Sequence, residues 1–155
     1  MSGLRRIPNI GTTWKTRGKD ELLARSLSAE DQAQLARNVV AIQARVAQAC
    51  AARQRDPAEV SLVCVTKYSG PAVVEGLRTL GQTDLGENRV EHFTQLHQQA
   101  SAGPRWHFIG HVQRNKAARI ANQLDVLHSL DGLALAQRLD RQRSPARPPL
   151  DVYLQ

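Results

Sequence analysis

The sequence contains few of the residues that mark several common protein classes. Cysteine occurs twice, at Cys50 and Cys64, which is too few for a disulfide framework and favours a reducing cytoplasm. No apolar run approaches the roughly 18 residues of a membrane-spanning helix, so we expect no membrane span. Aromatic residues make up only 4% of the chain, which argues against a stacking surface for single-stranded nucleic acid.

Two phosphate-binding signatures are also missing. The chain has no G-x-G-x-x-G after its first expected strand and no G-x-x-x-x-G-K-[ST] anywhere, which weakens a dinucleotide or nucleoside triphosphate interpretation. Its 21 Lys and Arg exceed its 14 Asp and Glu, for a net charge of +7. Such an excess could attract a phosphate-bearing ligand or serve only solubility.

Residues 1–27 differ from the rest of the chain. They show no periodic apolar pattern, contain three glycines and have no acidic residue before Asp20. A secretory signal needs an apolar stretch of about 7–15 residues, and this segment has none. We expect a flexible, basic N-terminal extension here, with an organellar transit peptide as the alternative.

From residue 28 onward the pattern is that of an ordered domain, which begins with a helix. Apolar residues at positions 35, 39, 42, 46 and 49 recur at helical spacing. Ser28 is a suitable N-cap for this helix. Pro57 ends it, because proline disfavours helix at the residue before it.

The remainder alternates short apolar runs with helical patterns. Strands are expected at 60–66, 83–86, 105–110, 125–130 and from 150 onward, with helices at 71–80, 88–99, 113–124 and 133–143. The first strand is continuous and β-branched, which predicts burial on both faces. Asp131 is the expected N-cap of the last helix. Such alternation indicates βαβ units and a parallel sheet, hence an α/β fold.

Two α/β architectures fit this alternation. Five strands could form a complete doubly wound sheet, which suits the length of 155 residues. The same elements could be the first four to five units of a TIM (β/α)8-barrel, a fold of about 250 residues. Periodicity alone does not choose between them.

In both architectures ligands bind at the carboxyl ends of the strands. Lys67 directly follows the first strand, and burial favours the neutral amine that can form a Schiff base with an aldehyde. A lysine reaching from this edge into water is the simpler interpretation. Asn88 follows the second strand and could orient a ligand oxygen or cap the next helix.

The histidines do not suggest a metal site. His107 and His111 are four residues apart, but an expected strand end and Gly110 separate them, so they do not share a helix face. His92 and His97 are expected on a solvated helix. His128 is expected as an interior histidine of a strand.

Several segments at these strand ends resemble the pyridoxal phosphate homeostasis protein family, which is related to the N-terminal barrel of alanine racemase. They are RDPAEV at 55–60, VTK at 65–67, GEN at 86–88 and WHFIGHVQRNK at 106–116. The resemblance runs from about residue 32 to the end, and its last block is the most specific.

The resemblance implies a TIM (β/α)8-barrel that holds pyridoxal 5'-phosphate as an aldimine on the lysine ending the first strand, here Lys67. Asn88 would lie beside the cofactor ring, and His107 would line the floor of the pocket. Family members are regarded as cofactor carriers in vitamin B6 homeostasis without established turnover. The resemblance therefore implies a non-catalytic protein whose partner is a small-molecule cofactor, without nucleic acid, membrane or metal. The full-length form would be a monomer.

A racemase-like enzyme that uses pyridoxal phosphate is the alternative, and it would need a second acid/base group for which the sequence offers no candidate. The sequence also departs from the family pattern. Tyr68 and Ser69 stand where a second basic residue commonly follows the lysine. The family's later phosphate-binding segments have no counterpart before Gln155, so the chain resembles the first half of such a protein. A chain of this kind would hold the cofactor weakly and could self-associate.

Overall fold

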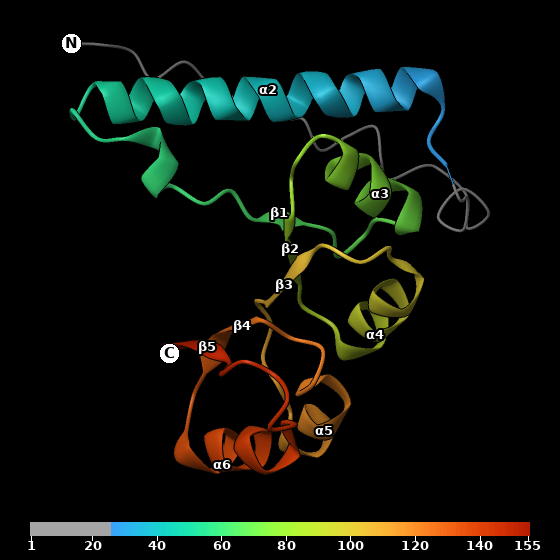
Figure 1. Ribbon diagram of the computed structural model, residues 1–155, viewed down its shortest axis with the longest axis vertical. Coiled ribbons are helices and arrows are strands. Elements are labelled where there is room, and N and C mark those ends of the chain that lie inside the picture. Colours follow the sequence, from blue (N-terminus) through green and yellow to red (C-terminus); the bar gives the residue numbers. More distant parts are fainter. Residues whose placement is uncertain (1–25) are drawn as a thin grey trace.

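A five-stranded parallel sheet organises the molecule (Figure 1). The computed structural model describes residues 26–155, so the extension expected at 1–27 lies almost wholly outside the described residues. The strands are β1 (Cys64–Val65), β2 (Asp84–Glu87), β3 (Arg105–Phe108), β4 (Val126–Leu130) and β5 (Asp151–Leu154). Each strand pairs in parallel with its neighbour in the sequence, giving the order β1-β2-β3-β4-β5.

The helices that connect the strands lie along one side of the sheet (Figure 1). They are α3 (Pro71–Thr79), α4 (Val90–Gln99), α5 (Ala117–Ile120) and α6 (Leu133–Gln142). Right-handed crossovers that always step the same way along a sheet place every helix on one face. A doubly wound sheet reverses its direction and carries helices on both faces, so that alternative is wrong.

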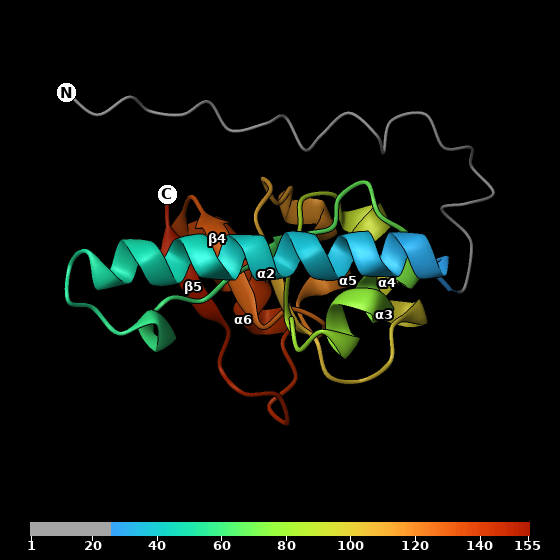
Figure 2. The ribbon, with the colours of Figure 1, turned by 90° about the horizontal axis from the view of Figure 1, so that it is seen from above.

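A long helix, α2 (Ala29–Ala51), precedes the sheet and lies across its β1 end (Figures 1 and 2). A short 3-10 turn, η1 (Pro57–Glu59), links it to β1. Only part of the expected apolar stripe of α2 is buried, since Val39 is buried whereas Ile42 is 36% exposed. Leu35 packs over Gly76 of α3, where an added Cβ would lie 3.0 Å from its side chain.

The apolar core lies between the sheet and the connecting helices. Leu85, Phe108 and Leu127 point from three neighbouring strands into this layer and are fully buried. Phe93 of α4 meets Trp106 and Phe108 edge-on, at ring-centroid distances of 5.5 and 6.3 Å. Edge-to-face pairs of this kind stabilise by more than their buried area alone.

Local signals set three helix ends as expected. The Ser28 hydroxyl accepts a hydrogen bond from the Asp31 backbone N–H at 3.1 Å, which caps α2. Pro71 occupies the first position of α3, where its missing N–H costs nothing. Gly81 follows α3 with a φ of +75°, a left-handed conformation that favours glycine.

The first strand is shorter and more open than predicted. Only Cys64 and Val65 of the expected strand 60–66 pair with β2. Val65 is 49% exposed, so the prediction of burial on both faces is wrong. The physical reason is that, among the described residues, helices cover only one face of the sheet, and Val65 lies on the other.

Two further details differ from the prediction. The helix expected at 113–124 is a 3-10 turn, η2 (Arg114–Lys116), followed by the four residues of α5. Gly132, not Asp131, is the N-cap of α6, and no side chain caps that end. Asp131 instead lies 3.2 Å from the ring of His111.

Between residues 26 and 155 no helix is long and apolar enough to cross a bilayer.

Candidate functional site

The strand register brings three predicted site residues to one end of the sheet. Val65 aligns with Gly86, and Gly86 aligns with His107. Lys67 and Asn88 each follow this aligned row by two residues, so they leave the sheet at the same level. His107 therefore lies one layer deeper in the sheet than Lys67 and Asn88. In the part of the chain that the structure describes, no hydrogen bond joins these three side chains to one another.

Lys67 lies in a tight turn directly after β1. Its side chain is half-buried, and its Nζ lies 5.3 Å from the centroid of the Tyr68 ring. Tyr68 is itself 71% exposed, so this cation–π contact lies at the surface. Within residues 26–155 no carboxylate forms an ion pair with Lys67, which leaves its amine available to a ligand.

A buried hydrogen-bond network lies beneath this turn. Thr66 donates its hydroxyl to Glu87 Oε1 at 2.5 Å, and the Glu87 side chain is fully buried. The other carboxylate oxygen, Oε2, lies 3.1 Å from Nδ1 of His92 on α4. The pKa of His92 is raised, first by this hydrogen bond to Glu87, while partial burial opposes the shift. The expectation that His92 lies on a solvated face is therefore wrong.

Asn88 does not cap the helix that follows it. The N-cap of α4 is Arg89, and no side chain caps that end. The Oδ1 atom of Asn88 is buried and has no hydrogen-bond partner among residues 26–155. A buried acceptor left without a donor costs free energy, so this atom suits a ligand that brings one. The backbone of Asn88 also touches Gly110 so closely that a Cβ at position 110 would collide with the Asn88 carbonyl oxygen.

His107 belongs to a row of polar side chains on the open face of the sheet. Its Nε2 lies 2.8 Å from Asp84 Oδ1, and its Nδ1 lies 2.9 Å from His128 Nε2. The ring of Tyr153 stacks on His128 with centroids 4.8 Å apart. In the tautomer in which His107 Nε2–H donates to Asp84, His107 Nδ1 accepts a hydrogen bond from the Nε2–H of His128. Burial, and then His107 and Arg105, lower the pKa of His128.

Sequence reasoning missed Asp84, Glu87 and His92 as members of these networks. For Asp84 the sequence held part of a signal, because strand alternation places residues 84 and 86 on one face. That His107 lies beside them follows from the β2–β3 register, which the structure shows. No comparable local signal pairs Glu87 with Thr66, which is 21 residues away.

Across residues 26–155 no group of three or more His, Cys, Asp or Glu is placed to hold a metal ion.

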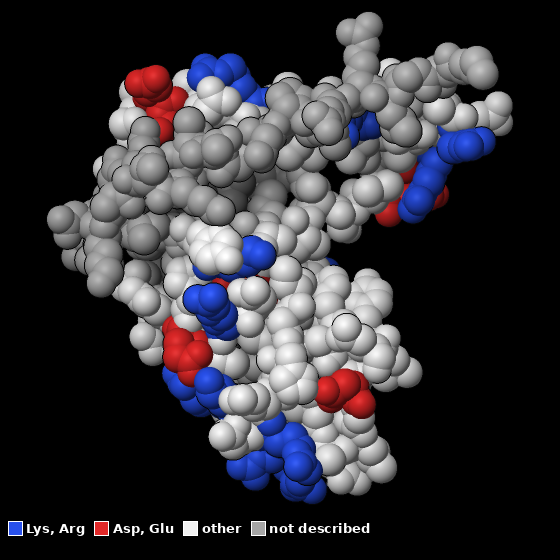
Figure 3. All heavy atoms as spheres, turned by 180° about the vertical axis from the view of Figure 1, so that it is seen from behind, with Lys and Arg blue, Asp and Glu red and all other residues white. Residues whose placement is uncertain are grey.

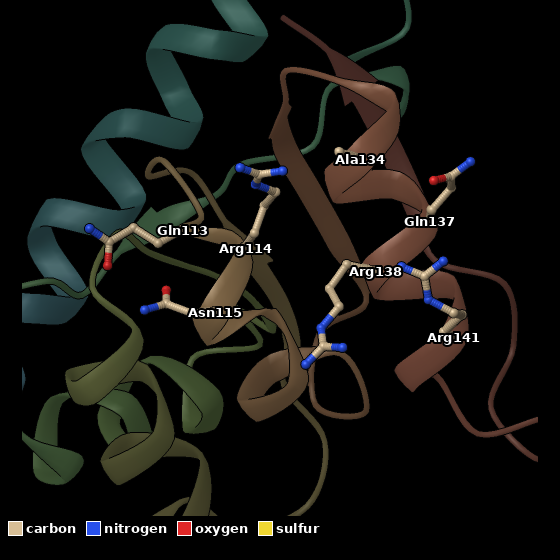
Figure 4. A pocket seen from close by; sticks show the side chains of 7 residues that line it. All are labelled: Gln113, Arg114, Asn115, Ala134, Gln137, Arg138 and Arg141. Atoms are coloured by element: carbon tan, nitrogen blue, oxygen red, sulfur yellow. The ribbon is translucent and has the colours of Figure 1, made fainter.

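A separate basic pocket of about 670 Å³ lies between η2 and α6 (Figure 4). Its lining residues are Gln113, Arg114, Asn115, Ala134, Gln137, Arg138 and Arg141. Lys and Arg gather toward the α6 end of the molecule on the face that Figure 3 shows. This cavity includes none of Lys67, Asn88 and His107. It is therefore distinct from the candidate site.

Sequence comparison relates the chain to a set of curated bacterial proteins. The pyridoxal phosphate homeostasis protein of Pseudomonas aeruginosa is 39% identical over 122 residues, which are 78% of this chain and 53% of that protein. The protein of the same name from Escherichia coli K12 is 32% identical over 128 residues, with the same coverages. The chain thus spans about half the length of the curated relatives it matches. No family model matches the sequence.

Structure comparison agrees with the sequence matches. PipY of Synechococcus elongatus, solved with PLP bound, has a TM-score of 0.54 and 32% identity over 63% of this chain and 47% of its own. An unknown protein from Bifidobacterium adolescentis has a TM-score of 0.69 over 79% of this chain and 54% of its own. Since its identity is 22%, that second match speaks for the fold alone.

Proposed function

Because the chain belongs to the family of pyridoxal phosphate homeostasis proteins, we propose that it binds pyridoxal 5'-phosphate and takes part in vitamin B6 homeostasis. The observation that carries the proposal is a half-buried lysine, Lys67, which forms no ion pair with any described carboxylate and lies at the carboxyl end of β1, level with Asn88. A solved relative of 32% identity has PLP bound.

The fold we propose for the complete site is a (β/α)8 barrel, of which this chain supplies five strands. Three observations support it: the strands follow one another in sequence order, all pairs are parallel, and the connecting helices share one face. The open face, with Val65 and His107, would then be the interior of the barrel. In that arrangement the carboxyl ends of the strands form the ligand-binding end.

Within this site each of the three residues has a separate task. Lys67 offers its Nζ to the cofactor aldehyde, and a Schiff base forms between them with loss of one water. Asn88 offers its unpartnered Oδ1 as a hydrogen-bond acceptor beside the ligand. His107, held by Asp84 and His128, supplies a fixed polar floor one layer deeper.

A carrier and a racemase-like enzyme differ in what they require of the protein. Proton removal and return on opposite faces of a bound amino acid require two acid/base groups. Lys67 is one such group. We propose the carrier role because the curated relatives are named pyridoxal phosphate homeostasis proteins. An assay of alanine racemisation with added cofactor checks it, and turnover that depends on Lys67 would favour the enzyme.

The test of the binding proposal is borohydride reduction of cofactor-soaked protein, followed by peptide mapping. We expect selective labelling at Lys67, abolished in Lys67→Ala. The matched control is Lys116→Ala, because Lys116 is partly exposed and paired with Glu91 at 2.8 Å. Labelling that spreads over the other lysines and persists in Lys67→Ala would overturn the proposal.

Retention of the cofactor tests a second aspect of the same site. A phosphate dianion is held best by backbone N–H groups at a helix N-terminus. The sequence resemblance assigns that role to segments beyond residue 155. We therefore expect the label to be lost when the protein is dialysed before reduction. Retention of the label through dialysis would show that residues 1–155 bind the phosphate themselves.

A further inference from the structure

We propose that Glu87 and His92 are positioning residues for Lys67, holding the turn that carries it through a buried, charge-assisted hydrogen-bond network. The inference rests on the proposed role of Lys67 and extends it to residues that the ligand does not touch. It also makes the position of Lys67 sensitive to pH through the ionisation of His92.

The network holds the lysine turn at both of its ends. Glu87 Oε1 accepts from the hydroxyl of Thr66, the residue directly before Lys67. His92 is hydrogen-bonded to Glu87 Oε2. The backbone of Ser69, two residues after Lys67, faces the same imidazole and contributes to raising its pKa. One buried carboxylate and one imidazole therefore connect both flanks of Lys67 to β2 and α4.

The backbone of the turn depends on the same contacts. The Thr66 N–H donates to the Gly86 carbonyl at 2.9 Å, which ends the pairing of β1 with β2. The Ser69 N–H donates to the Thr66 carbonyl at 2.7 Å and closes the turn. Because Lys67 lies inside this turn, the direction of its side chain follows from where Thr66 and Ser69 are held.

The pKa of His92 depends on its buried hydrogen-bond partner, Glu87. A fully buried carboxylate is costly unless hydrogen bonds or an opposite charge compensate it. Hydrogen bonding and charge attraction from Glu87, together with the Ser69 backbone, raise the pKa of His92, whereas partial burial and the Arg89 charge lower it. Arg89 and Glu87 are the charged groups that face this imidazole among the described residues.

Protonation changes what the imidazole can hold. The charged ring can donate from both nitrogens, but the neutral ring has one donor and one acceptor. It therefore loses a hydrogen bond either to Glu87 or to the Ser69 backbone as the pH rises through its pKa. Because this pKa lies above the ordinary value near 6.5, we expect the turn to be held more firmly on the acid side of the pKa and to loosen on the alkaline side.

The first experiment needs no cofactor. Backbone amide signals of residues 67–70 and the ring signals of His92 are followed by NMR from pH 5 to 9 in the 155-residue chain. We expect the turn amides to shift with the same midpoint as His92, and that midpoint to vanish from them in His92→Phe and Glu87→Gln. The inference would be overturned if the turn amides did not shift with the midpoint of His92, or if they kept that midpoint in both variants.

The second experiment measures the rate of Lys67 labelling with pyridoxal phosphate and borohydride across the same pH range. We expect labelling at pH 6 to fall by about tenfold in Glu87→Gln and His92→Phe, the effect of one hydrogen bond to a charged group. The difference should shrink toward pH 9, where His92 is neutral in the parent chain. A constant loss at every pH would indicate a merely structural role and contradict the inference.

The matched control is His97→Gln, on the same helix. His97 is half-buried like His92, but it lies against the rings of Phe93 and Trp106 and has no hydrogen bond to Glu87. This variant should keep the parent pH profile. If Lys67 is labelled selectively but the pH profile of labelling is unchanged in the Glu87 and His92 variants, the inference is rejected and the proposed function stands. If the turn amides titrate with His92 but Lys67 is not labelled selectively, the proposed function is rejected and the inference about the turn stands.

Discussion

The two faces of the sheet are built from the same short strands, yet they differ in almost every physical property. On the helix side Leu85, Phe108 and Leu127 are fully buried in an apolar layer. On the open side Asp84 and His107 form a hydrogen-bonded polar row. A strand of four residues, such as β3, serves both faces because successive side chains alternate. The fold thus places an apolar core and a polar row on opposite sides of the same strands.

The ionisable groups sharpen this contrast. His92 reaches the buried carboxylate of Glu87, and that contact raises its pKa. His128 on the open face has no carboxylate partner among the described residues, and burial with nearby positive charge lowers its pKa. The pKa values of these two histidines are therefore shifted in opposite directions, and the hydrogen bond from His92 to Glu87 is the main cause of the upward shift.

The largest expected effect is on the helix side. Phe108→Ala removes a ring that packs against Phe93 and should reduce the free energy of unfolding by about 3–5 kcal/mol. Tyr153→Ala on the open face is the control, since Tyr153 is 60% exposed, and should change it by about 0.5 kcal/mol or less. Urea unfolding followed by circular dichroism measures both. Equal losses would break the distinction between the faces.

The next effect is at the end of β3, where the two faces meet the ligand-binding edge. Gly110→Ala places a Cβ against the Asn88 carbonyl and should cost about 1–3 kcal/mol, while displacing Asn88. Gly132→Ala is the matched control, because nothing lies within 4 Å of its added Cβ. Thermal melting of both variants is the measurement. A Gly110→Ala variant as stable as Gly132→Ala would disprove the close approach.

A smaller effect is expected from the polar row itself. Asp84→Ala leaves His107 Nε2 without its acceptor and should cost about 1–2 kcal/mol. Asp84→Asn keeps an oxygen in place and should cost less. Urea unfolding at pH 7 compares the two. If both variants matched the parent chain, the row would contribute nothing to stability.

The smallest effects are the pH dependences of stability. His128 binds its proton less readily when folded, so its contribution is lost as the pH falls below about 6.5. His92 binds its proton more readily when folded, so its contribution is present below that value and is lost as the pH rises through its raised pKa. The melting temperatures of His128→Gln and His92→Gln are compared with that of the parent chain from pH 5 to 8. We expect His92→Gln to lose most stability at the acidic end of this range and His128→Gln at the alkaline end. Deviations on the same side would contradict the assigned causes.

Local sequence signals predicted which elements form more accurately than they predicted how long each element is. Ser28, Pro71 and Gly81 act on the chain beside them, and the helix ends they predict are confirmed. The helix expected at 113–124 is shorter, and residues just beyond its end form hydrogen bonds to distant parts of the chain. Asn122 accepts from the Ser144 N–H and donates to the Gln142 carbonyl. Such contacts cross about 20 residues of sequence and leave no local pattern.

Sheet order was beyond the reach of periodicity for a similar reason. Strands recurring about every 20 residues fit a doubly wound sheet and a barrel equally, since both are made of βαβ units. The positions of Lys67, Asn88 and His107 at strand ends follow from either architecture. Their shared register does not, because it requires β1, β2 and β3 to be neighbours in that order.

The sequential pairing of strands also bears on how the chain folds. Paired residues such as Cys64 and Leu85, Leu85 and Trp106, and Leu127 and Val152 are 21, 21 and 25 residues apart. Each pairing therefore closes a loop of similar and modest length, and low sequence separation of contacts favours fast folding. A chain that emerges from the ribosome N-terminus first can add each strand to one already made. A lengthened connection in one unit would then slow the closing of that unit and leave the earlier ones unchanged.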